Sequence, residues 1–372
     1  MKKLFYLTLV CSMNFFITSC DKDDDDHDDH GHNVTAPADY TFERNGVNSV
    51  AYAGQTCRLN QASALDAAMK ENSTTAAMIN DMIYNGIFST TIESCTDQKI
   101  GNKIAGGTNS SLSDNDKQEV QDMFIAMVNG HGDVLAASSN SGSAGVAGTV
   151  YETGGTARWV DEKGLELNQG IMKGLIGAMC LDQITNKYTH PEYLSGKDNT
   201  EVTADNYTSM EHYWDEGFGY LYGRDQQTAP ILEQDALLNK YLGKVSTQFP
   251  NHASDIYDAF KLGRAAIVAG DSDLRDEQAM IIKERLDDVV AYKASDYLRG
   301  GAGELSSGNP VDAFHDLSEG YGFIISLQFT DHFSHSQVDG MLTDLMAGNG
   351  FWDRTADELN AMAEVIDAAM GF

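Results

Sequence analysis

The sequence predicts an all-α protein, a duplicated helical bundle in which two related repeats pack about a pseudo-two-fold axis, preceded by an extended N-terminal arm. Apolar residues recur at intervals of three and four along most of the 372 residues, and the alternation typical of strands is scarce. Only five prolines are present, and most of them lie between periodic segments. A nine-residue pattern also occurs twice, which indicates a duplication. Helices with one apolar stripe bury it against one another, so a bundle follows.

The first nineteen residues have the pattern of an export leader. A positively charged start is followed by an apolar run over 4–17, which is too short to span a bilayer as a mature helix. The run ends in Ile-Thr-Ser-Cys at Cys20, which resembles the lipobox of bacterial lipoproteins. We expect residues 1–19 to be a lipoprotein signal peptide and Cys20 to carry acyl chains that anchor the protein in a membrane. An ordinary secretory signal with a chance cysteine is the alternative.

Residues 20–33 are predicted to form a disordered tether. Seven aspartates and three histidines lie within 21–32, and charges of one sign at this density repel one another and cannot bury apolar surface. The segment resembles the acidic tag that sends lipoproteins of some Gram-negative bacteria to the outer face of the outer membrane, so we expect a cell-surface location. A solvated spacer is the simple interpretation; loose capture of divalent metal by the histidines and aspartates is the other.

The remaining residues, 34–372, are enough for one large domain. We expect an extended arm over 34–58 and a flexible Ser/Gly/Ala-rich connection over 138–156. The periodic segments predict helices over 60–71, 73–87, 113–137, 158–188, 204–223, 232–243, 251–269, 272–299, 310–329, 335–347 and 355–370. Ser113 is expected to cap the third of them.

The charge balance restricts the possible partners. The chain has 25 Lys and Arg against 56 Asp and Glu, a net charge of −31. A surface this negative repels nucleic acid and anionic lipid headgroups, so no nucleic-acid partner is expected.

Three cysteines remain after the leader is removed and Cys20 is acylated. Cys180 lies in an apolar run and is expected to be buried. Cys57 and Cys95 are then the one sensible disulfide pair for an exported protein. No C-x-x-C pair occurs, so a thiolate zinc site has no support.

The repeated pattern is H-x-x-x-E-G-aromatic-G-aromatic. It covers residues 212–220 and 315–323, both in segments with helical periodicity. Each copy follows a long helix that carries charged residues, which predicts two related units over roughly 158–223 and 274–329.

The histidine and the glutamate of the pattern are candidate metal ligands. Histidine and glutamate four residues apart share one helix face. If the two copies face each other, they form a cluster of two imidazoles and two carboxylates that suits iron, zinc or manganese; its members are His212, Glu216, His315 and Glu319. The alternative is that each pair is a satisfied buried contact that sets helix register.

Glu166 and Lys173 are the next candidates for a ligand site. They are seven residues apart and share a helix face, so they line the same interior site or pair with neighbouring residues. The charged stretch that ends at Arg264 is expected on a helix surface or an interface.

Several motifs together resemble a bacterial lipoprotein family of unknown function allied to the imelysins. These are the lipobox, Tyr40-x-Phe42-x-Arg44, Gly54-Gln55-Thr56-Cys57-Arg58-Leu59, Gly164-Leu165-Glu166-x-x-Gln169, Lys173-Gly174-Leu175-Ile176-Gly177-Ala178 and His212-x-x-x-Glu216-Gly217. The resemblance implies a duplicated, imelysin-like helical bundle on the cell surface or in the periplasm, with a role in iron acquisition. Some imelysins have been called metallopeptidases, and their shared motif is G-x-H-x-x-E. Here Met210 replaces the glycine, and the spacing from histidine to glutamate is one residue longer.

Three functions remain open. The first is a surface lipoprotein that binds a divalent metal, iron or zinc, or an iron-bearing ligand, and assists a neighbouring uptake protein. The second is a metallopeptidase with Glu216 or Glu319 as general base. The third is a structural or docking module. The chain has neither H-E-x-x-H nor G-x-S-x-G, so a non-enzymatic role is favoured.

Overall fold

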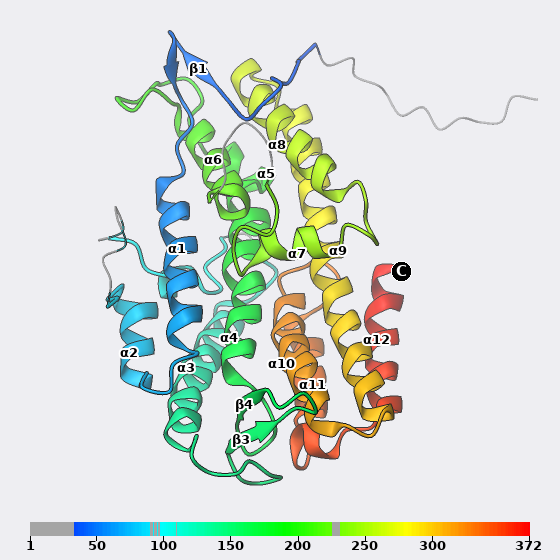
Figure 1. Ribbon diagram of the computed structural model, residues 1–372. Helices are drawn as coiled ribbons and strands as arrows, with labels where there is room; N and C mark the ends of the chain where they lie inside the picture. The colour runs from blue at the N-terminus through cyan, green and yellow to red at the C-terminus, as the bar shows by residue number, and fades with distance from the viewer. Residues whose placement is uncertain (1–32, 90–91, 93–94, 96, 109, 225–230) are drawn as a thin grey trace, which may run out of the picture. The chain divides into compact units, whose positions relative to one another are not determined.

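Helices make up most of the body, which confirms the all-α prediction (Figure 1). The computed structural model describes residues 33–372 except 90–91, 93–94, 96, 109 and 225–230. The leader over 1–19, the lipidation site Cys20 and the tether up to residue 32 lie outside the described residues. Val34–Phe372 form one compact unit.

The α-helices are α1 (Ala53–Ala68), α2 (Ala76–Asn80), α3 (Asp114–Ala136), α4 (Leu167–Leu175), α5 (Pro191–Ser195), α6 (Ser209–Tyr222), α7 (Leu238–Lys244), α8 (His252–Ala269), α9 (Ser272–Ser306), α10 (Pro310–Leu327), α11 (His335–Leu345) and α12 (Ala356–Met370). Shorter π and 3₁₀ turns are η1 (Asp81–Asn85), η2 (Gly101–Lys103), η3 (Ile176–Leu181), η4 (Ile184–Tyr188) and η5 (Gly350–Asp353). Two antiparallel hairpins pair β1 (Glu43–Arg44) with β2 (Val47–Asn48) and β3 (Gly148–Tyr151) with β4 (Ala157–Val160).

Capping residues explain where several helices begin. Ser113 accepts a hydrogen bond from the backbone N–H of Asp116, whose side chain accepts from Ser113 in return, so α3 starts where the sequence predicts. The same reciprocal cap opens α6 at Thr208 and α12 at Thr355. Each cap satisfies backbone donors that a helix start leaves unpaired.

Three of the expected segments differ from the structure. The arm ends earlier, because α1 begins at Ala53. The segment 138–156 is not a simple flexible connection, since β3 lies in it and pairs with β4. The segment 158–188 is not one helix: Asp161 accepts from the backbone N–H of Leu165, and Gly164 has a φ of +87°. That turn delays α4 until Leu167.

The core is organised around α9 and α4. The 35-residue α9 packs against α8, α10 and α12, and α10 also packs along α4 in the middle of the unit (Figure 1). Nearly every residue from Leu167 to Leu181 is buried. A helix buried on all sides carries its polar side chains into the interior, and α4 therefore places Gln169 and Lys173 there.

The N-terminal arm is fixed to the body by an aromatic and an ionic contact. The ring of Tyr40 stacks on Phe218 with 3.7 Å between centroids, and its hydroxyl donates to Asp215 at 2.7 Å. Arg264, expected on a helix surface or at an interface, is not on the surface: it is fully buried and pairs with Glu211 at 2.9 Å and Asp215 at 3.0 Å. The arm packs on this group: the Phe42 ring centroid lies 4.9 Å from the Arg264 guanidinium, and Arg44 pairs with Glu211 at 2.9 Å.

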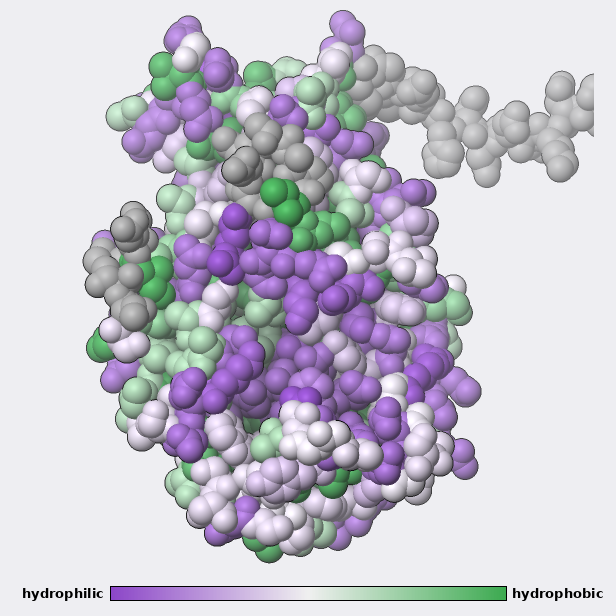
Figure 2. All heavy atoms as spheres, viewed as in Figure 1, coloured by the Kyte–Doolittle hydropathy of each residue, from purple (hydrophilic) through white to green (hydrophobic). Residues whose placement is uncertain are grey.

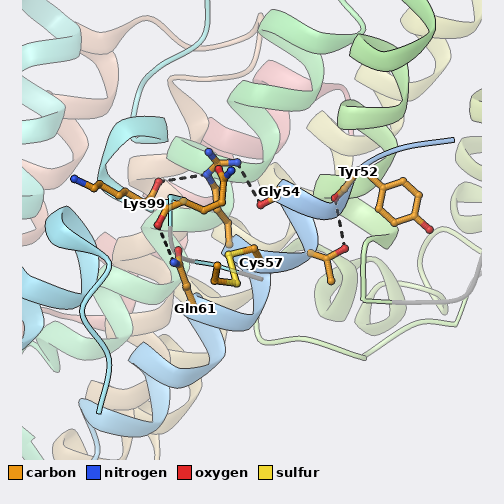
Figure 3. The surroundings of a disulfide bond; sticks show 9 residues. Tyr52, Gly54, Cys57, Gln61 and Lys99 are labelled. Atoms are coloured by element: carbon orange, nitrogen blue, oxygen red, sulfur yellow. Dashed lines mark hydrogen bonds between the residues drawn. A yellow bond between two sulfur atoms is a disulfide. The ribbon is translucent and has the colours of Figure 1, made fainter. Parts of the chain in front are cut away.

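Cys57 and Cys95 form a disulfide, as predicted, and Cys180 is buried and free. The disulfide holds the loop before η2 against α1 (Figure 3). Gln61 donates to the carbonyl of Gln98 at 2.8 Å, and Arg58 donates to the carbonyl of Lys99 at 3.3 Å. Within the described part of the chain, no helix combines the length and the apolar character needed to span a bilayer.

Candidate functional site

The two copies of the repeated pattern lie on α6 and α10, and each is crossed closely by another helix. At Gly219, a Cβ atom would clash with Tyr52 and Gln55 at the start of α1. At the matching position, Gly322, a Cβ atom would clash with Lys173 on α4. The second glycine of each copy therefore marks where α1 crosses α6 and where α4 crosses α10.

Other matching positions make matching contacts. Asp215 accepts from the backbone N–H of Ala51 at 3.2 Å, just before α1. Its counterpart Ser318 accepts from the backbone N–H of Glu166 at 2.9 Å, just before α4. In both copies the residue three positions after the histidine thus satisfies a backbone donor at the start of the crossing helix.

The crossing of α4 and α10 gathers a set of buried and partly buried polar groups, called here the α4–α10 cluster. Its members are Glu166, Gln169, Lys173, Tyr241, Tyr297, His315 and Glu319.

Lys173 and Glu319 form the centre of this cluster. The Lys173 ammonium lies 2.9 Å from Glu319 Oε1 and donates to Gln169 Oε1 at 2.9 Å. Tyr241 donates to Glu319 Oε2 at 3.4 Å. His315 stands between the two carboxylates, with Nδ1 3.0 Å from Glu166 and Nε2 3.8 Å from Glu319.

The electrostatics keep Glu319 ionised. Burial alone would raise the pKa of this carboxyl, but the Lys173 ammonium and the hydrogen bond from Tyr297 outweigh burial and hold it below its ordinary value. Burial and the Glu319 charge raise the pKa of the Tyr241 hydroxyl well above its usual range. Tyr241 therefore stays protonated and remains a donor.

A surface hollow leads to this cluster. It has a volume of about 190 Å³ and is lined by Lys70, Ala157, Arg158, Trp159, Glu166, Asn168 and Gln169. Glu166 is only 3% exposed; one oxygen of its carboxylate lies 3.7 Å from Arg158, and the other lies 3.0 Å from Nδ1 of His315. Glu166 thus lies between the hollow and the partly buried His315 imidazole. Figure 2 shows hydrophilic side chains gathered across the middle of the face where α4, α7 and α10 lie in Figure 1.

The first copy of the pattern has different partners. Glu216 accepts from Gln55 Nε2 of α1 at 2.8 Å. The His212 ring stacks on Tyr207 with 4.5 Å between centroids, and its buried Nδ1 has no hydrogen-bond partner among the described residues.

The structure therefore divides the six candidate residues. His315, Glu319, Glu166 and Lys173 meet in the α4–α10 cluster, whereas Glu216 contacts Gln55 and His212 packs on Tyr207. Across the described ranges, no group of three or more His, Cys, Asp or Glu side chains is placed to hold a metal ion. The Lys173 ammonium already pairs with Glu319, so the side chains of the α4–α10 cluster, in this arrangement, do not fit a bound metal.

Sequence reasoning missed Tyr241 and Tyr297, which come from α7 and α9. No local signal marks them, because their hydroxyls reach Glu319 only through the packing of these helices against α10. Arg158 was also missed, since β4 lies in a segment expected to be helical.

The chain belongs to a family described as Domain of unknown function (DUF4856), whose model matches residues 37–372. No curated protein and no solved structure shows a significant match to it.

Proposed function

We propose that this protein is a lipid-anchored, extracytoplasmic binding protein without a catalytic role. Its ligand site is the α4–α10 cluster, and it serves a neighbouring uptake protein on the bacterial surface. The leader pattern ending at Cys20 supports the anchor, and the acidic tether supports the surface location.

The observation that carries the binding role is the position of Glu166. Its carboxylate is buried, yet it lines the hollow and contacts Arg158 on one side and His315 on the other. A buried carboxylate at the end of an open hollow can hold a ligand cation with little competition from water. Lys70 and Arg158 in the same lining can hold an anionic group.

This mixed lining favours a small zwitterionic ligand of amino-acid or dipeptide size. Its ammonium would bind Glu166 and Gln169, its carboxylate would bind Arg158 and Lys70, and Trp159 offers an apolar face. Pockets for drug-sized molecules measure about 300–1,000 Å³, so a hollow of about 190 Å³ takes only a small molecule.

The matched contacts of α6 and α10 also support a duplicated, imelysin-like arrangement. In this proposal α1 and α6 form one pair and α4 and α10 the other, related by a pseudo-two-fold axis. The glycine crossings at Gly219 and Gly322 and the acceptors at Asp215 and Ser318 support the equivalence. One pair has then kept an open polar hollow.

A divalent metal is the second candidate ligand for the same cluster. The specific observation in its favour is the His315 imidazole between the carboxylates of Glu166 and Glu319. Lys173 would have to leave Glu319 first, because its ammonium already neutralises that carboxylate. Metal binding should therefore strengthen in Lys173→Met.

The test uses the protein lacking residues 1–32, which retains the whole compact unit. Amino acids, dipeptides, Zn²⁺ and Fe²⁺ are screened by thermal shift and then by calorimetry. Glu166→Gln and His315→Ala should weaken any hit at least tenfold, while His212→Ala, the matched histidine of the other copy, should not. If none of these ligands binds, the protein is a docking module and the binding proposal is wrong.

A further inference from the structure

A second group of polar residues lies apart from the α4–α10 cluster, around the tyrosines of η4, α5 and α6. Four cations contact these rings and form what we call the cationic cluster: Arg58, Lys103, Lys187 and Lys197.

Two lysines lie on the ring of one tyrosine. The ammonium groups of Lys103 and Lys187 are 5.6 and 5.2 Å from the ring centroid of Tyr188, and Lys103 also donates to the Tyr188 hydroxyl at 3.1 Å. Lys197 lies 4.0 Å from the ring centroid of Tyr193. Cation–π contacts position these charges without neutralising them.

None of the four cations has a carboxylate within ion-pair distance among the described residues, whose ion pairs involve other side chains. Two carboxylates, Glu216 and Asp182, act on Lys187 from further away, and their hydrogen-bond partners are neutral groups. Glu216 accepts from Gln55, and the buried Asp182 accepts from the backbone N–H of Gly107 and from Asn186. Four cations therefore share two carboxylates that lie beyond ion-pair distance, which is a local excess of positive charge in a chain of net charge −31.

The pKa values of two of the lysines also indicate that these cations would gain from an anion. Burial lowers the pKa of Lys103 to about 8, and the Arg58 and Lys187 charges add to the effect. Burial also lowers the pKa of Lys187. Both lysines would gain from a nearby anion, because an opposite charge favours the charged form.

The Tyr220 hydroxyl is a further polar group beside these cations. The fully buried hydroxyl of Tyr220 lies near Arg58 and Glu216 but has no hydrogen bond of normal geometry to a described residue. A buried hydroxyl without a well-formed hydrogen bond costs free energy that a bound acceptor would recover.

The disulfide fixes one side of the cluster. It ties the loop that leads to Lys103 against α1, and Arg58 donates to the carbonyl of Lys99 in that loop (Figure 3). Arg58 and Lys103 are thus held together before any ligand arrives. Prior ordering lowers the entropic cost of binding.

We propose that the cationic cluster is a binding site for a small solute that carries a phosphate or carboxylate group, with Lys103, Lys187 and Arg58 as its cationic ligands. This site is distinct from the α4–α10 cluster and does not depend on the function proposed for that cluster. The same chemistry occurs in an anionic lipid headgroup, so the experiment separates a free solute from a lipid.

The purified protein is titrated with inorganic phosphate, sulfate and citrate by calorimetry at low ionic strength. Lys103→Ala and Lys187→Ala should each weaken binding of at least one anion about tenfold or more, with melting temperature monitored to show that the fold is intact. Lys103→Arg, which keeps the charge, should bind better than Lys103→Ala. Lys240→Ala is the matched control, because Lys240 is also half-buried with a lowered pKa but lies on α7; it should bind as the parent does.

Two outcomes would overturn the proposal. One is that no free anion binds, or that binding is equal in Lys103→Ala, Lys187→Ala and the parent. The other comes from a parallel sedimentation with vesicles of phosphatidylglycerol: vesicle binding that needs Lys103 and Lys187, without binding of any free anion, would assign the cluster to a lipid headgroup instead.

Discussion

The ammonium of Lys173 lies 2.9 Å from the carboxylate of Glu319, at the point where α4 crosses α10. Both side chains are 10% exposed or less, and Gly322 on α10 is what lets the two helices come this close. The same few residues therefore set the helix packing and the polar interior. A mutation that opens the pair changes both.

Breaking this pair from one side should be costly. Lys173→Met leaves Glu319 buried without its cation, and we expect a loss of about 3–5 kcal/mol in the free energy of unfolding. Adding Glu319→Gln should recover part of this loss, because the uncompensated charge is then gone. Urea denaturation of the parent, the two single variants and the double variant measures the interaction. Additive losses would show that the two side chains do not depend on each other.

The glycine at the crossing gives a second prediction. Gly322→Ala should destabilise the protein by about 1–3 kcal/mol, because the new methyl group clashes with Lys173 on α4. Gly303→Ala is the matched control on α9, where a Cβ atom meets nothing within 4 Å. It should stabilise the protein by up to about 1 kcal/mol, since alanine favours a helix. Equal effects in thermal melts would contradict the close crossing.

The repeated pattern was visible in the sequence, but its partners were not. Histidine and glutamate four residues apart predict a shared face on α6 and on α10, which local periodicity is enough to show. The side chains that meet Glu216 and Glu319 come from α1 and α4, more than 140 residues earlier in the chain. Only the packing of helices decides such contacts. The spacing of residues in the sequence therefore could not show whether the two histidines and two glutamates meet.

The start of α4 shows a different limit. Apolar periodicity runs through 158–188, yet the bonds of Asp161 and the positive φ of Gly164 hold residues before Leu167 out of the helix. Glu166 consequently precedes the first helical residue rather than lying within a helix. A local side-chain bond to the backbone competed with the helix and prevailed. By contrast, the cap at Ser113 is local and was predictable.

The buried carboxyl of Asp287 predicts how stability depends on pH. Burial raises its pKa to about 7, and the nearby Asp331 and Asp288 charges add to this, while Lys283 opposes it. Between about pH 4 and 7, the Asp287 carboxyl therefore keeps its proton in the folded protein, whereas in the unfolded chain, where its pKa is near 3.8, it has lost it. Stability should fall as the pH rises through this window and level off above it.

Asp287→Asn should remove this contribution, which is on the order of a few kcal/mol between pH 5 and pH 8. Melting temperatures across that range measure it, with the exposed Asp344→Asn on α11 as control. A parent and an Asp287→Asn variant with parallel pH profiles would show that Asp287 is ionised throughout.

The disulfide should contribute substantially to stability. Cys57 and Cys95 are 38 residues apart, and closing a loop of this length restricts the unfolded chain by about 4 kcal/mol in the chain-entropy model. Reduction should lower the denaturation midpoint of the parent and leave a Cys57→Ser/Cys95→Ser variant unchanged. The reduced parent and that variant should then unfold at similar denaturant concentrations; an unchanged midpoint on reduction would argue against the pairing.

The pair that fixes the arm gives the last prediction. Arg264 is fully buried and is shared by Glu211 and Asp215, and burial already raises the pKa of Asp215 despite its contact with Arg264. Arg264→Met would leave the Asp215 carboxyl buried without a cation, so we expect a loss of about 3–5 kcal/mol. Arg285→Ala breaks a partly exposed pair between α9 and Asp255 on α8 and should cost about 1 kcal/mol or less. Chemical denaturation of both variants measures these losses. Similar small losses would mean that the arm does not depend on Arg264. In that case protease cleavage before α1 should be no faster in Arg264→Met than in the parent.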